Sequence, residues 1–484
     1  MVNTTAVLLG LLASTTSVVE NVSNSLFGNV TGPSPVAAAA PAVTSTITPP
    51  PFGYTAGSPE SVANLKDKIK RVVWILLENR SFDNILGGVA RPGLDNPTNN
   101  GNVCNPVDVT QPNGTTLCTR LKDFDSIAND PDHSVTGNNF EFYGQFAPDN
   151  TAIQNGTLVA TNQGFVEKQT ISYSTITANV AAEEVMGYYS EAEVPTMVEI
   201  VDEFLTFNYW FSCIPGPTNP NRACALSGTS GGHGFNDEFF EDAGLNFTSI
   251  FQAASEKDVT WLNYDGTNGA FAPDALFYTW TEENAKNNVV PIENFFQDAY
   301  LGLLPQLSYL NPSCCGANSN SMHPTGNVSF GQIFVKQVYD ALRQGPQWDE
   351  TLLVLTYDES GGFHDHVASP LAVPTDNLSY TETAHNGQSY TFHFDRLGGR
   401  MPTFLISPFV PKAHIENFGT NPATGQAEAY SATSVLKTLG LLWDIEDFTD
   451  RVSNSPSFDH LIGPTMRVDP PLVFPVPKPF PNDV

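Results

Sequence analysis

Two short apolar runs stand out along the chain because each ends abruptly in acidic and amide side chains. Residues 72–77 read VVWILL and are followed by Glu78 and Asn79, and residues 352–356 read LLVLT and are followed closely by Asp358 and Glu359. Uninterrupted apolar runs of this length predict strands that are buried on both faces. In open α/β sheets, ligands bind at the carboxyl ends of the strands. The pattern therefore predicts oxygen-rich side chains gathered at one edge of a sheet.

Amphipathic segments surround these runs and predict the rest of the framework. Helical patterns are expected at residues 61–70, 183–205, 331–343 and 432–442, with a third strand at 402–407. Alternation of strands and helices favours an α/β fold, a mostly parallel central sheet with helices on both faces. Residues 90–135 are dense in Asn, Pro, Gly and Asp, so we expect them to contribute to a loop-rich cap near that edge.

The composition narrows the class of protein. The 484 residues carry a formal net charge of −30, which argues against binding nucleic acid through a basic face and against docking on anionic membranes. Residues 6–13 form a short apolar core, so residues 1–19 are interpreted as a signal peptide without a positive leader. Residues 20–60 read as a Pro/Ala/Thr-rich disordered lead-in, and 61–484 as the catalytic domain. The sequence predicts a secreted glycoprotein without a transmembrane anchor.

Six cysteines are compatible with disulfides in an oxidising compartment. The local pairs expected are Cys104 with Cys118 and Cys213 with Cys224. Cys314 and Cys315 are adjacent and are not expected to bond to each other, which leaves other pairings open.

A further candidate for chemistry is the segment around Thr218. Gly216 and Pro217 predict a turn that leaves Thr218 at the start of a helix, where free backbone N–H groups favour phosphate and an alkoxide. Arg222 follows one helical turn later and offers a fork for phosphate oxygens. Taken alone, the same residues also fit an ordinary helix cap and a surface arginine.

Several motifs, taken together and in order, resemble the phosphoesterase family, which includes non-specific phospholipases C and certain acid phosphatases. The resemblance covers about residues 70–450. The motifs are residues 78–83 (ENRSFD), 129–134 (NDPDHS), 216–222 (GPTNPNR), 227–230 (SGTS), 302–305 (GLLP), 323–324 (HP), 346–353 (PQWDETLL), 356–367 (TYDESGGFHDHV) and 400–408 (RMPTFLISP).

The resemblance implies an alkaline-phosphatase-like fold and a metal-dependent phosphoryl site. Thr218 would be the nucleophile, and Asn221 and Arg222 would bind substrate. The metal ligands it implies are Glu78, Asn79, Thr218, Asp358 and Glu359. Its implied contacts to phosphate or to the leaving group are His133, His323 and His366, of which His133 and His366 are the preferred acids. The oxygen-rich set leaves the divalent cation open among Ca²⁺, Mg²⁺, Mn²⁺ and Zn²⁺.

Other residues near the motifs are expected to have no catalytic role. His364 is expected at the surface, and His233, after two glycines, is expected to be structural. One departure from the family pattern is Ala432, where many relatives carry histidine, and it puts the headgroup or leaving-group preference in doubt.

The function predicted is hydrolysis of phosphate esters, favouring phospholipase C-type diesters, with phospholipids among the possible substrates. A secreted acid phosphatase for monoesters is the alternative, and a non-catalytic phospho-ligand-binding glycoprotein is the third reading. An apolar rim for acyl chains is sought among four aromatic residues that also fit a core: Phe140, Phe142, Tyr143 and Phe146.

Overall fold

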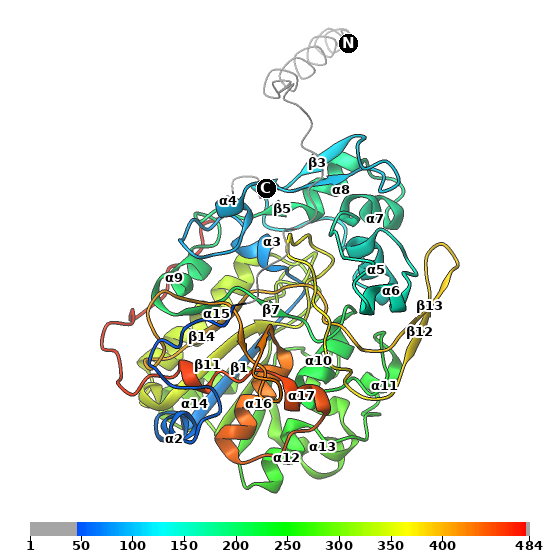
Figure 1. The fold of residues 1–484 in the computed structure, drawn as a ribbon. Helices are drawn as coiled ribbons and strands as arrows, with labels where there is room; N and C mark the ends of the chain where they lie inside the picture. The colour runs from blue at the N-terminus through cyan, green and yellow to red at the C-terminus, as the bar shows by residue number, and fades with distance from the viewer. Residues whose placement is uncertain (1–45, 481–484) are drawn as a thin grey trace, which may run out of the picture. The chain divides into compact units, whose positions relative to one another are not determined.

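The computed structural model describes residues 46–480, and its framework is an eight-stranded sheet (Figure 1). The strand order is β15-β6-β14-β11-β1-β10-β8-β9. Their bounds, in that order, are His414–Glu416, Leu205–Phe207, Thr403–Ile406, Thr351–Tyr357, Arg71–Leu77, Leu307–Asn311, Trp261–Asp265 and Val289–Pro291. All neighbours pair in parallel except at β14, which runs antiparallel to both β11 and β6. The mostly parallel α/β sheet is confirmed.

The two strands singled out in the sequence lie side by side at the centre of this sheet. β1 pairs with β11 in parallel from Arg71 opposite Thr351 to Leu77 opposite Tyr357. Apart from Arg71, every residue of both strands is buried, which explains why neither strand shows polar alternation. Because the two strands end at the same pair, Leu77 opposite Tyr357, the residues that follow them lie next to each other.

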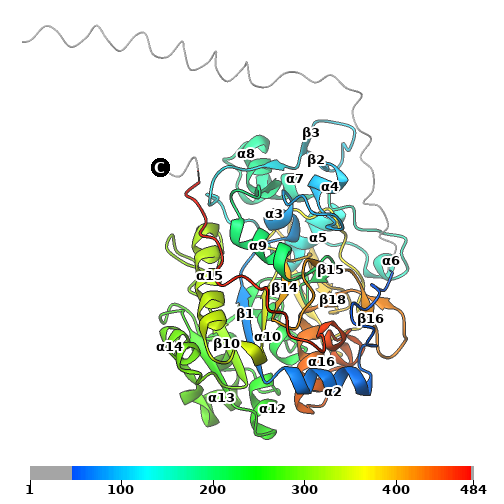
Figure 2. The ribbon, with the colours of Figure 1, turned by 90° about the vertical axis from the view of Figure 1, so that its left-hand side faces the viewer.

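Helices cover both faces of the sheet. In Figure 2, α14 (Glu293–Leu301) and α15 (Val328–Gln344) lie on one side of the sheet, and α10 (Thr218–Ser227) and α16 (Ala432–Trp443) lie on the other. α15 buries the face that carries Phe334, Val338 and Leu342, the spacing that the sequence pattern predicts. The remaining α-helices are α2 (Pro59–Lys68), α3 (Phe82–Leu86), α4 (Pro97–Asn100), α5 (Val135–Tyr143), α6 (Asn150–Gln154), α7 (Phe165–Ser172), α8 (Ala178–Val185), α9 (Pro195–Glu203), α11 (Glu238–Glu241), α12 (Ile250–Glu256), α13 (Thr279–Asn284) and α17 (Asp450–Asn454).

The cap at the carboxyl edge of β1 contains more regular structure than its composition predicts. It carries α5 to α8 and two small sheets, visible above the central sheet in Figure 1. These sheets pair β2 (Cys104–Pro106) with β3 (Thr116–Cys118) and β4 (Arg120–Leu121) with β5 (Gly187–Tyr188). The other small sheets pair β12 (Tyr380–Thr383) with β13 (Ser389–Phe392), β16 (Gly419–Thr420) with β17 (Ala427–Glu428), and β7 (Trp210–Phe211) with β18 (Tyr430–Ser431).

Most of the predicted elements are present, with two corrections. The helices expected at 331–343 and 432–442 are α15 and α16, and the strand at 402–407 is β14. The single helix expected over 183–205 is wrong, because α8 ends at Val185 and α9 begins only at Pro195, which sets φ for the first turn of a helix. The helix expected over 61–70 begins two residues earlier, at Pro59, and Ser58 caps it.

The ordered chain also begins earlier than residue 61. Ile47 bridges to Phe418, and the Gly57 backbone N–H donates to the Asp459 carboxylate. The interpretation of residues 1–19 as a signal peptide, and most of that of 20–60 as a lead-in, lies outside the described residues. Within residues 46–480, no helix has the length and apolarity that crossing a membrane requires.

All six cysteines are paired. The bonds Cys104–Cys118 and Cys213–Cys224 agree with the expectation from the sequence. The expectation that Cys314 and Cys315 do not bond to each other is wrong, because the structure joins them. With the other four cysteines paired locally, these two neighbours are left in one loop, where Cys315 adopts a positive φ of 72°.

Candidate active site at the ends of two parallel strands

The first layer of the site is the pair of turns that follow β1 and β11. The Asn79 backbone N–H donates to Asp358 Oδ1 over 3.1 Å, and the Arg80 backbone N–H donates to the Glu359 carbonyl over 3.2 Å. Asn79 has a positive φ of 56°, a conformation that Asn tolerates better than most residues. These bonds hold the Glu78–Asn79 and Asp358–Glu359 pairs together, as the sequence pattern predicts.

Residue 361 must be glycine because the turn after β11 lies very close to the backbone of the turn after β1. Its φ is +67°, and a Cβ there would lie 2.4 Å from the Asn79 carbonyl oxygen. The Gly361 backbone N–H in turn donates to Glu359 Oε2 over 2.5 Å. The Gly-Gly turn after the carboxylates therefore lets the two strand ends touch and also orients one of the carboxylates.

Thr218 enters the site from the start of α10. Pro217 precedes it in an extended conformation, so Thr218 is the first residue of the helix and lies at the positive end of its dipole. Its Oγ1 lies 3.4 Å from Asn79 Oδ1. Thr218 also lines a cavity of about 310 Å³ together with Glu78 and His323. The structure thus brings Thr218, Glu78, Asn79 and Asp358 into one group, as expected.

Arg222 lines the same cavity as Thr218, and its guanidinium contacts three carboxylates. Its Nε donates to Asp358 Oδ2 over 3.0 Å and its Nη1 to Asp274 Oδ2 over 2.9 Å, while Nη2 lies 3.6 Å from Glu78 Oε1. Burial disfavours the charged form of Arg222 and by itself would lower its pKa. The Asp274, Glu78 and Asp358 carboxylates have the larger effect and raise the pKa of Arg222 well above its usual value. The guanidinium is committed to carboxylates, so we assign it to positioning them.

Asn221 is also occupied by the protein itself. Its Oδ1 accepts from the Ile214 backbone N–H over 2.9 Å, and its Nδ2 donates to the Gly216 carbonyl over 2.7 Å and to the Pro217 carbonyl over 3.1 Å. The side chain is 1% exposed. These bonds fix the turn that delivers Thr218, a role that the motif alone does not reveal.

Two histidines complete the group. His133 Nε2 lies 3.4 Å from Asn79 Nδ2 and 4.0 Å from Glu359 Oε1, and its Nδ1 bonds to the Pro131 carbonyl over 2.7 Å. The rings of His133 and His323 are 6.5 Å apart and nearly perpendicular. His323 therefore lines the same cavity as Thr218, and His133 and Thr218 both lie next to the Asn79 side chain.

The electrostatics of the site show a surplus of negative charge. Burial, which outweighs the opposing effect of Arg222, raises the pKa of Asp358 to about 6. Burial likewise raises the pKa of Glu359 to about 8, against the lowering effect of His133 and with a further contribution from Asp358. Burial would lower the pKa of His133, but Glu359 and Asp130 outweigh it and raise that pKa to about 9. His133 is thus protonated at neutral pH.

The residues fit a divalent cation. Glu78, Asn79, Thr218, Asp358 and Glu359 supply only carboxylate, amide and hydroxyl oxygens, which Mg²⁺, Ca²⁺ and Mn²⁺ prefer. Glu359 Oε1 is buried and has no hydrogen-bond partner. A buried, unpartnered carboxylate oxygen is costly unless a cation pairs with it.

His366 lies in a second buried cluster. Its Nδ1 is 2.7 Å from Asp83 Oδ2 and its Nε2 is 2.8 Å from Asp95 Oδ1. Arg400 joins the cluster through Asp83 Oδ1 at 2.9 Å and Asp365 Oδ1 at 3.0 Å. Both ring nitrogens of His366 are therefore engaged by carboxylates, and the structure does not bring this histidine to Thr218.

Three further expectations are corrected or located by the structure. His364 is 2% exposed rather than at the surface, and its ring packs 5.1 Å from the Phe165 ring, so burial lowers its pKa to about 4. His233 bonds through Nδ1 to Asp237 over 2.7 Å, which fits a structural role. Ala432 is 2% exposed at the start of α16.

The apolar rim proposed from the sequence is not at the surface. Its four members are buried in the cap, each 9% exposed or less: Phe140, Phe142, Tyr143 and Phe146. The cavity wall instead carries Phe271, which is 45% exposed, and the acidic residues Asp237, Glu238 and Glu241. Sequence reasoning missed this wall because Phe271 lies in a loop that carries no recognisable motif.

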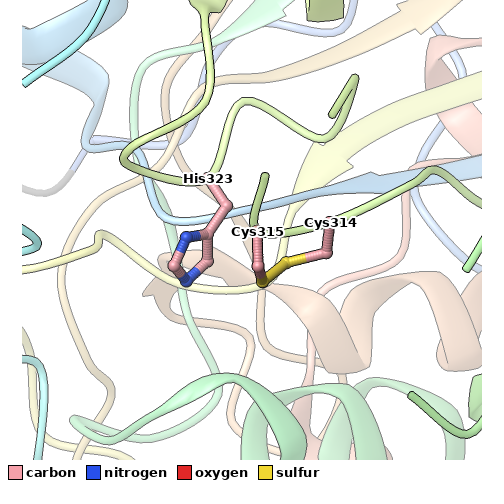
Figure 3. Close-up of side chains that lie close together, drawn as sticks. All are labelled: Cys314, Cys315 and His323. Atoms are coloured by element: carbon pink, nitrogen blue, oxygen red, sulfur yellow. A yellow bond between two sulfur atoms is a disulfide. The ribbon is translucent and has the colours of Figure 1, made fainter. Parts of the chain in front are cut away.

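Cys314 and Cys315 line the same cavity as His323. Figure 3 shows the imidazole of His323 beside the Cys315 sulfur. Cys315 is exposed and Cys314 is half-buried.

Comparison with known proteins agrees with this geometry. The Phosphoesterase family model matches residues 69–446. The chain belongs to the phosphoesterase family. It is 34% identical to non-specific phospholipase C6 of Arabidopsis thaliana over 423 residues, 84% of this chain and 75% of that protein. It is 30% identical to non-specific phospholipase C3 of the same plant, over 84% of this chain and 76% of that protein.

More distant similarities were also found. Hemolytic phospholipase C of Pseudomonas aeruginosa is 25% identical over 53% of this chain and 39% of its own length. Among solved structures, a phosphonate monoester hydrolase from Silicibacter pomeroyi aligns with a TM-score of 0.31 at 12% identity, over 58% of this chain and 73% of that one. A protein in the alkaline phosphatase superfamily from Vibrio parahaemolyticus aligns with a TM-score of 0.30 at 12% identity, over 55% of this chain and 64% of that one. This phosphoesterase family member is a hydrolase acting on phosphoester bonds.

Proposed function

We propose that this phosphoesterase is a metal-dependent phosphodiesterase of the phospholipase C type, with Thr218 as its nucleophile. The observation that carries the proposal is the position of the Thr218 hydroxyl. It lies at the start of α10, inside a cavity, 3.4 Å from Asn79 and in a group of carboxylates, one of which, Glu359, keeps an oxygen without a hydrogen bond. A hydroxyl in such a place is suited to attack on phosphorus.

The residues proposed to hold the cation are the oxygen donors grouped at the strand ends: Glu78, Asn79, Thr218, Asp358 and Glu359. When bound, a divalent cation would supply Lewis-acid stabilisation of negative charge on the phosphoryl oxygens and on the Thr218 oxygen. Arg222 keeps Glu78 and Asp358 oriented through its contacts with both carboxylates.

The protein's own residues carry the covalent step. Thr218 Oγ1 attacks the phosphorus in line with the departing alcohol and forms a phosphothreonine, which water then hydrolyses. The positive end of the α10 dipole, at Thr218, favours the anionic phosphoryl oxygens. Asn79 orients the Thr218 hydroxyl from the side of β1.

Proton transfer to the leaving group is assigned to His133 or His323. His133 is the stronger candidate for a general acid because its raised pKa of about 9 keeps it protonated at neutral pH. Its Nδ1 is held by the Pro131 carbonyl, so Nε2, which lies 3.4 Å from Asn79 Nδ2, is the nitrogen proposed to donate the proton. His366 is assigned to positioning the strand-end turns, because both of its ring nitrogens already bind carboxylates.

The substrate class proposed is a phospholipid phosphodiester. The relatives at 34% and 30% identity are named phospholipases C, and the exposed Phe271 gives the cavity one apolar wall. Export is proposed as well, since three disulfides favour an oxidising compartment.

The test compares two chromogenic substrates that differ only in the phosphate: a phosphocholine diester and the matching monoester. We expect a higher kcat/KM for the diester. We expect Thr218→Ala to reduce turnover by roughly a thousandfold or more and Thr218→Ser to retain part of it, because serine keeps the hydroxyl. A higher kcat/KM for the monoester would make the protein an acid phosphatase, and near-normal turnover of a folded Thr218→Ala variant would exclude Thr218 as nucleophile.

A further inference from the structure

One part of the cavity wall carries an unusual set of soft ligand atoms. Cys314, Cys315 and His323 each place one potential ligand atom within 4.8 Å of the others. The two sulfurs are joined in a disulfide between adjacent residues, and the imidazole lies beside them (Figure 3). The proposed phosphoryl chemistry uses His323 but has no use for either sulfur.

The geometry requires little change to become a metal site. Tetrahedral Zn²⁺ binds sulfur at about 2.3 Å and imidazole nitrogen at about 2.0–2.1 Å, which places any two ligand atoms roughly 3.3–3.8 Å apart. The three atoms of this group already lie within 4.8 Å of one another. Reduction of the S–S bond lets the two sulfurs move apart. A small movement of His323 toward them then brings its ring nitrogen within ligand distance of the same metal ion.

The imidazole is already held in the form that a metal takes. His323 Nδ1 donates to the Pro324 carbonyl, which leaves Nε2 as the ring nitrogen that can bind a metal. A backbone carbonyl that accepts from one ring nitrogen is the usual support of a histidine that binds metal through the other. This contact is an observation independent of the cysteines.

The Cys314–Cys315 bond is also the disulfide most open to a reductant. Cys315 is exposed, whereas Cys213 and Cys224 are fully buried. Thiol–disulfide exchange needs direct access to a sulfur, so a dithiol reacts first at the accessible bond.

We propose that Cys314, Cys315 and His323 form a redox-controlled binding site for a soft divalent cation of the Zn²⁺ type, at the wall of the catalytic cavity. In the oxidised protein the sulfurs bind each other and His323 is free to act on substrate. A dithiol transfers two electrons and two protons to the disulfide and becomes a cyclic disulfide itself. The two thiols then release their protons to solvent as thiolates bind Zn²⁺.

The metal site does not depend on the proposed function, but its effect on turnover does. With Zn²⁺ on His323, the imidazole no longer serves the substrate, and the ion narrows the cavity beside Thr218. Reduction followed by Zn²⁺ is therefore expected to inhibit hydrolysis, while reduction alone leaves the site open.

The binding test uses the whole protein, oxidised or mildly reduced with a phosphine that does not bind metal, and Co²⁺ as a spectroscopic probe. Reduced protein is expected to show a thiolate-to-cobalt charge-transfer band that oxidised protein lacks, and to take up one further Zn²⁺ per chain. Because the comparison is between two states of one chain, cations bound at the carboxylates cancel.

Variants locate the ligands. The double variant Cys314→Ser with Cys315→Ser is expected to lose the band, and His323→Ala to bind Co²⁺ at least tenfold more weakly. The matched control, Cys104→Ser with Cys118→Ser, removes the same number of sulfurs from the cap and is expected to retain the band. Absence of the band in reduced wild-type protein, or its persistence in the Cys314/Cys315 variant, would overturn the site. Zn²⁺ uptake without loss of turnover would overturn its control of the cavity.

Discussion

The two buried polar clusters beyond the ends of β1 and β11 are built from the same residue types but differ in how their charges are matched. In the second cluster, Asp83, Asp95 and Asp365 face Arg400 and His366, and all six carboxylate oxygens accept a hydrogen bond or an ion pair. In the first cluster, four carboxylates face Arg222 and His133, and Glu359 Oε1, which lies 4.0 Å from His133 Nε2, accepts no hydrogen bond. We propose that a bound cation completes the first cluster, whereas the chain itself completes the second.

We therefore propose that the first cluster serves catalysis and that the second stabilises the fold. The residues of the second cluster come from the turn after β1, the turn after β11 and the segment before β14, so their ion pairs tie three strands together. The first cluster is anchored by the same turns, but its Glu359 Oε1 accepts no hydrogen bond and lies 4.0 Å from His133 Nε2. Removing charge should therefore have opposite consequences in the two places.

The largest effect is expected from Glu359→Gln in the first cluster. Loss of this proposed ligand should lower kcat/KM for the diester by roughly 10²–10³-fold or more.

The same variant should change stability against pH. Without divalent cation, the folded state raises the pKa of Glu359 from its usual 4.5 to about 8, so ionisation of Glu359 destabilises the protein progressively between those pH values. Glu359→Gln should thus be more stable than wild type at pH 8 in chelator. Denaturant unfolding checks this, and a less stable variant would contradict the charge surplus.

The second cluster should respond in the opposite way to loss of Arg400. Arg400→Met leaves Asp83 and Asp365 buried without their partner, and we expect a loss of about 3–5 kcal/mol in the free energy of unfolding. Arg400→Lys, which keeps the charge but not the planar fork, should lose less. An unchanged free energy of unfolding in Arg400→Met would show that this cluster does not stabilise the fold.

A cation should stabilise the first cluster and not the second. At a concentration of 100 times its Kd, a divalent cation is expected to add about 2.7 kcal/mol to the free energy of unfolding of wild type. The cation should stabilise Glu359→Gln less than wild type, because one ligand is missing. It should stabilise Arg400→Lys as much as wild type. Equal stabilisation of all three proteins would place the cation elsewhere.

The smallest change over a single pH unit is expected from the pH dependence that His366 adds. Burial opposes its charge, but Asp83 and Asp95 outweigh it and raise the pKa of His366 from 6.5 to about 10. Its stabilising contribution is therefore complete below about pH 6.5 and is lost as the pH rises to about 10, on the order of 1 kcal/mol per pH unit. Unfolding of His366→Gln should show a shallower decline over this window, and an identical slope would exclude the ion pairs.

The sequence predicts the first cluster well because its residues follow two uninterrupted apolar strands. Buried parallel strands end at one edge, so Glu78 and Asp358 are adjacent whatever the loops do. The motif around Thr218 likewise predicts the helix that begins there.

The roles of individual polar residues depend on contacts that no local pattern records. Arg222 and Asn221 lie in the right motif, but their partners Asp274 and Ile214 are chosen by tertiary packing. His366 is drawn away from Thr218 by Asp95, which lies in a loop without a motif. The same limit applies to the cap, where α5 to α8 form in a region whose flanks read as loops.

The most direct test of the charge surplus is turnover of the chromogenic diester by wild-type protein, first stripped with chelator and then titrated with Mg²⁺, Ca²⁺, Mn²⁺ or Zn²⁺, with bound metal measured in each sample. We predict that stripping abolishes hydrolysis and that at least one of these cations restores it in proportion to the metal bound. Full turnover by protein that contains no metal would contradict the account.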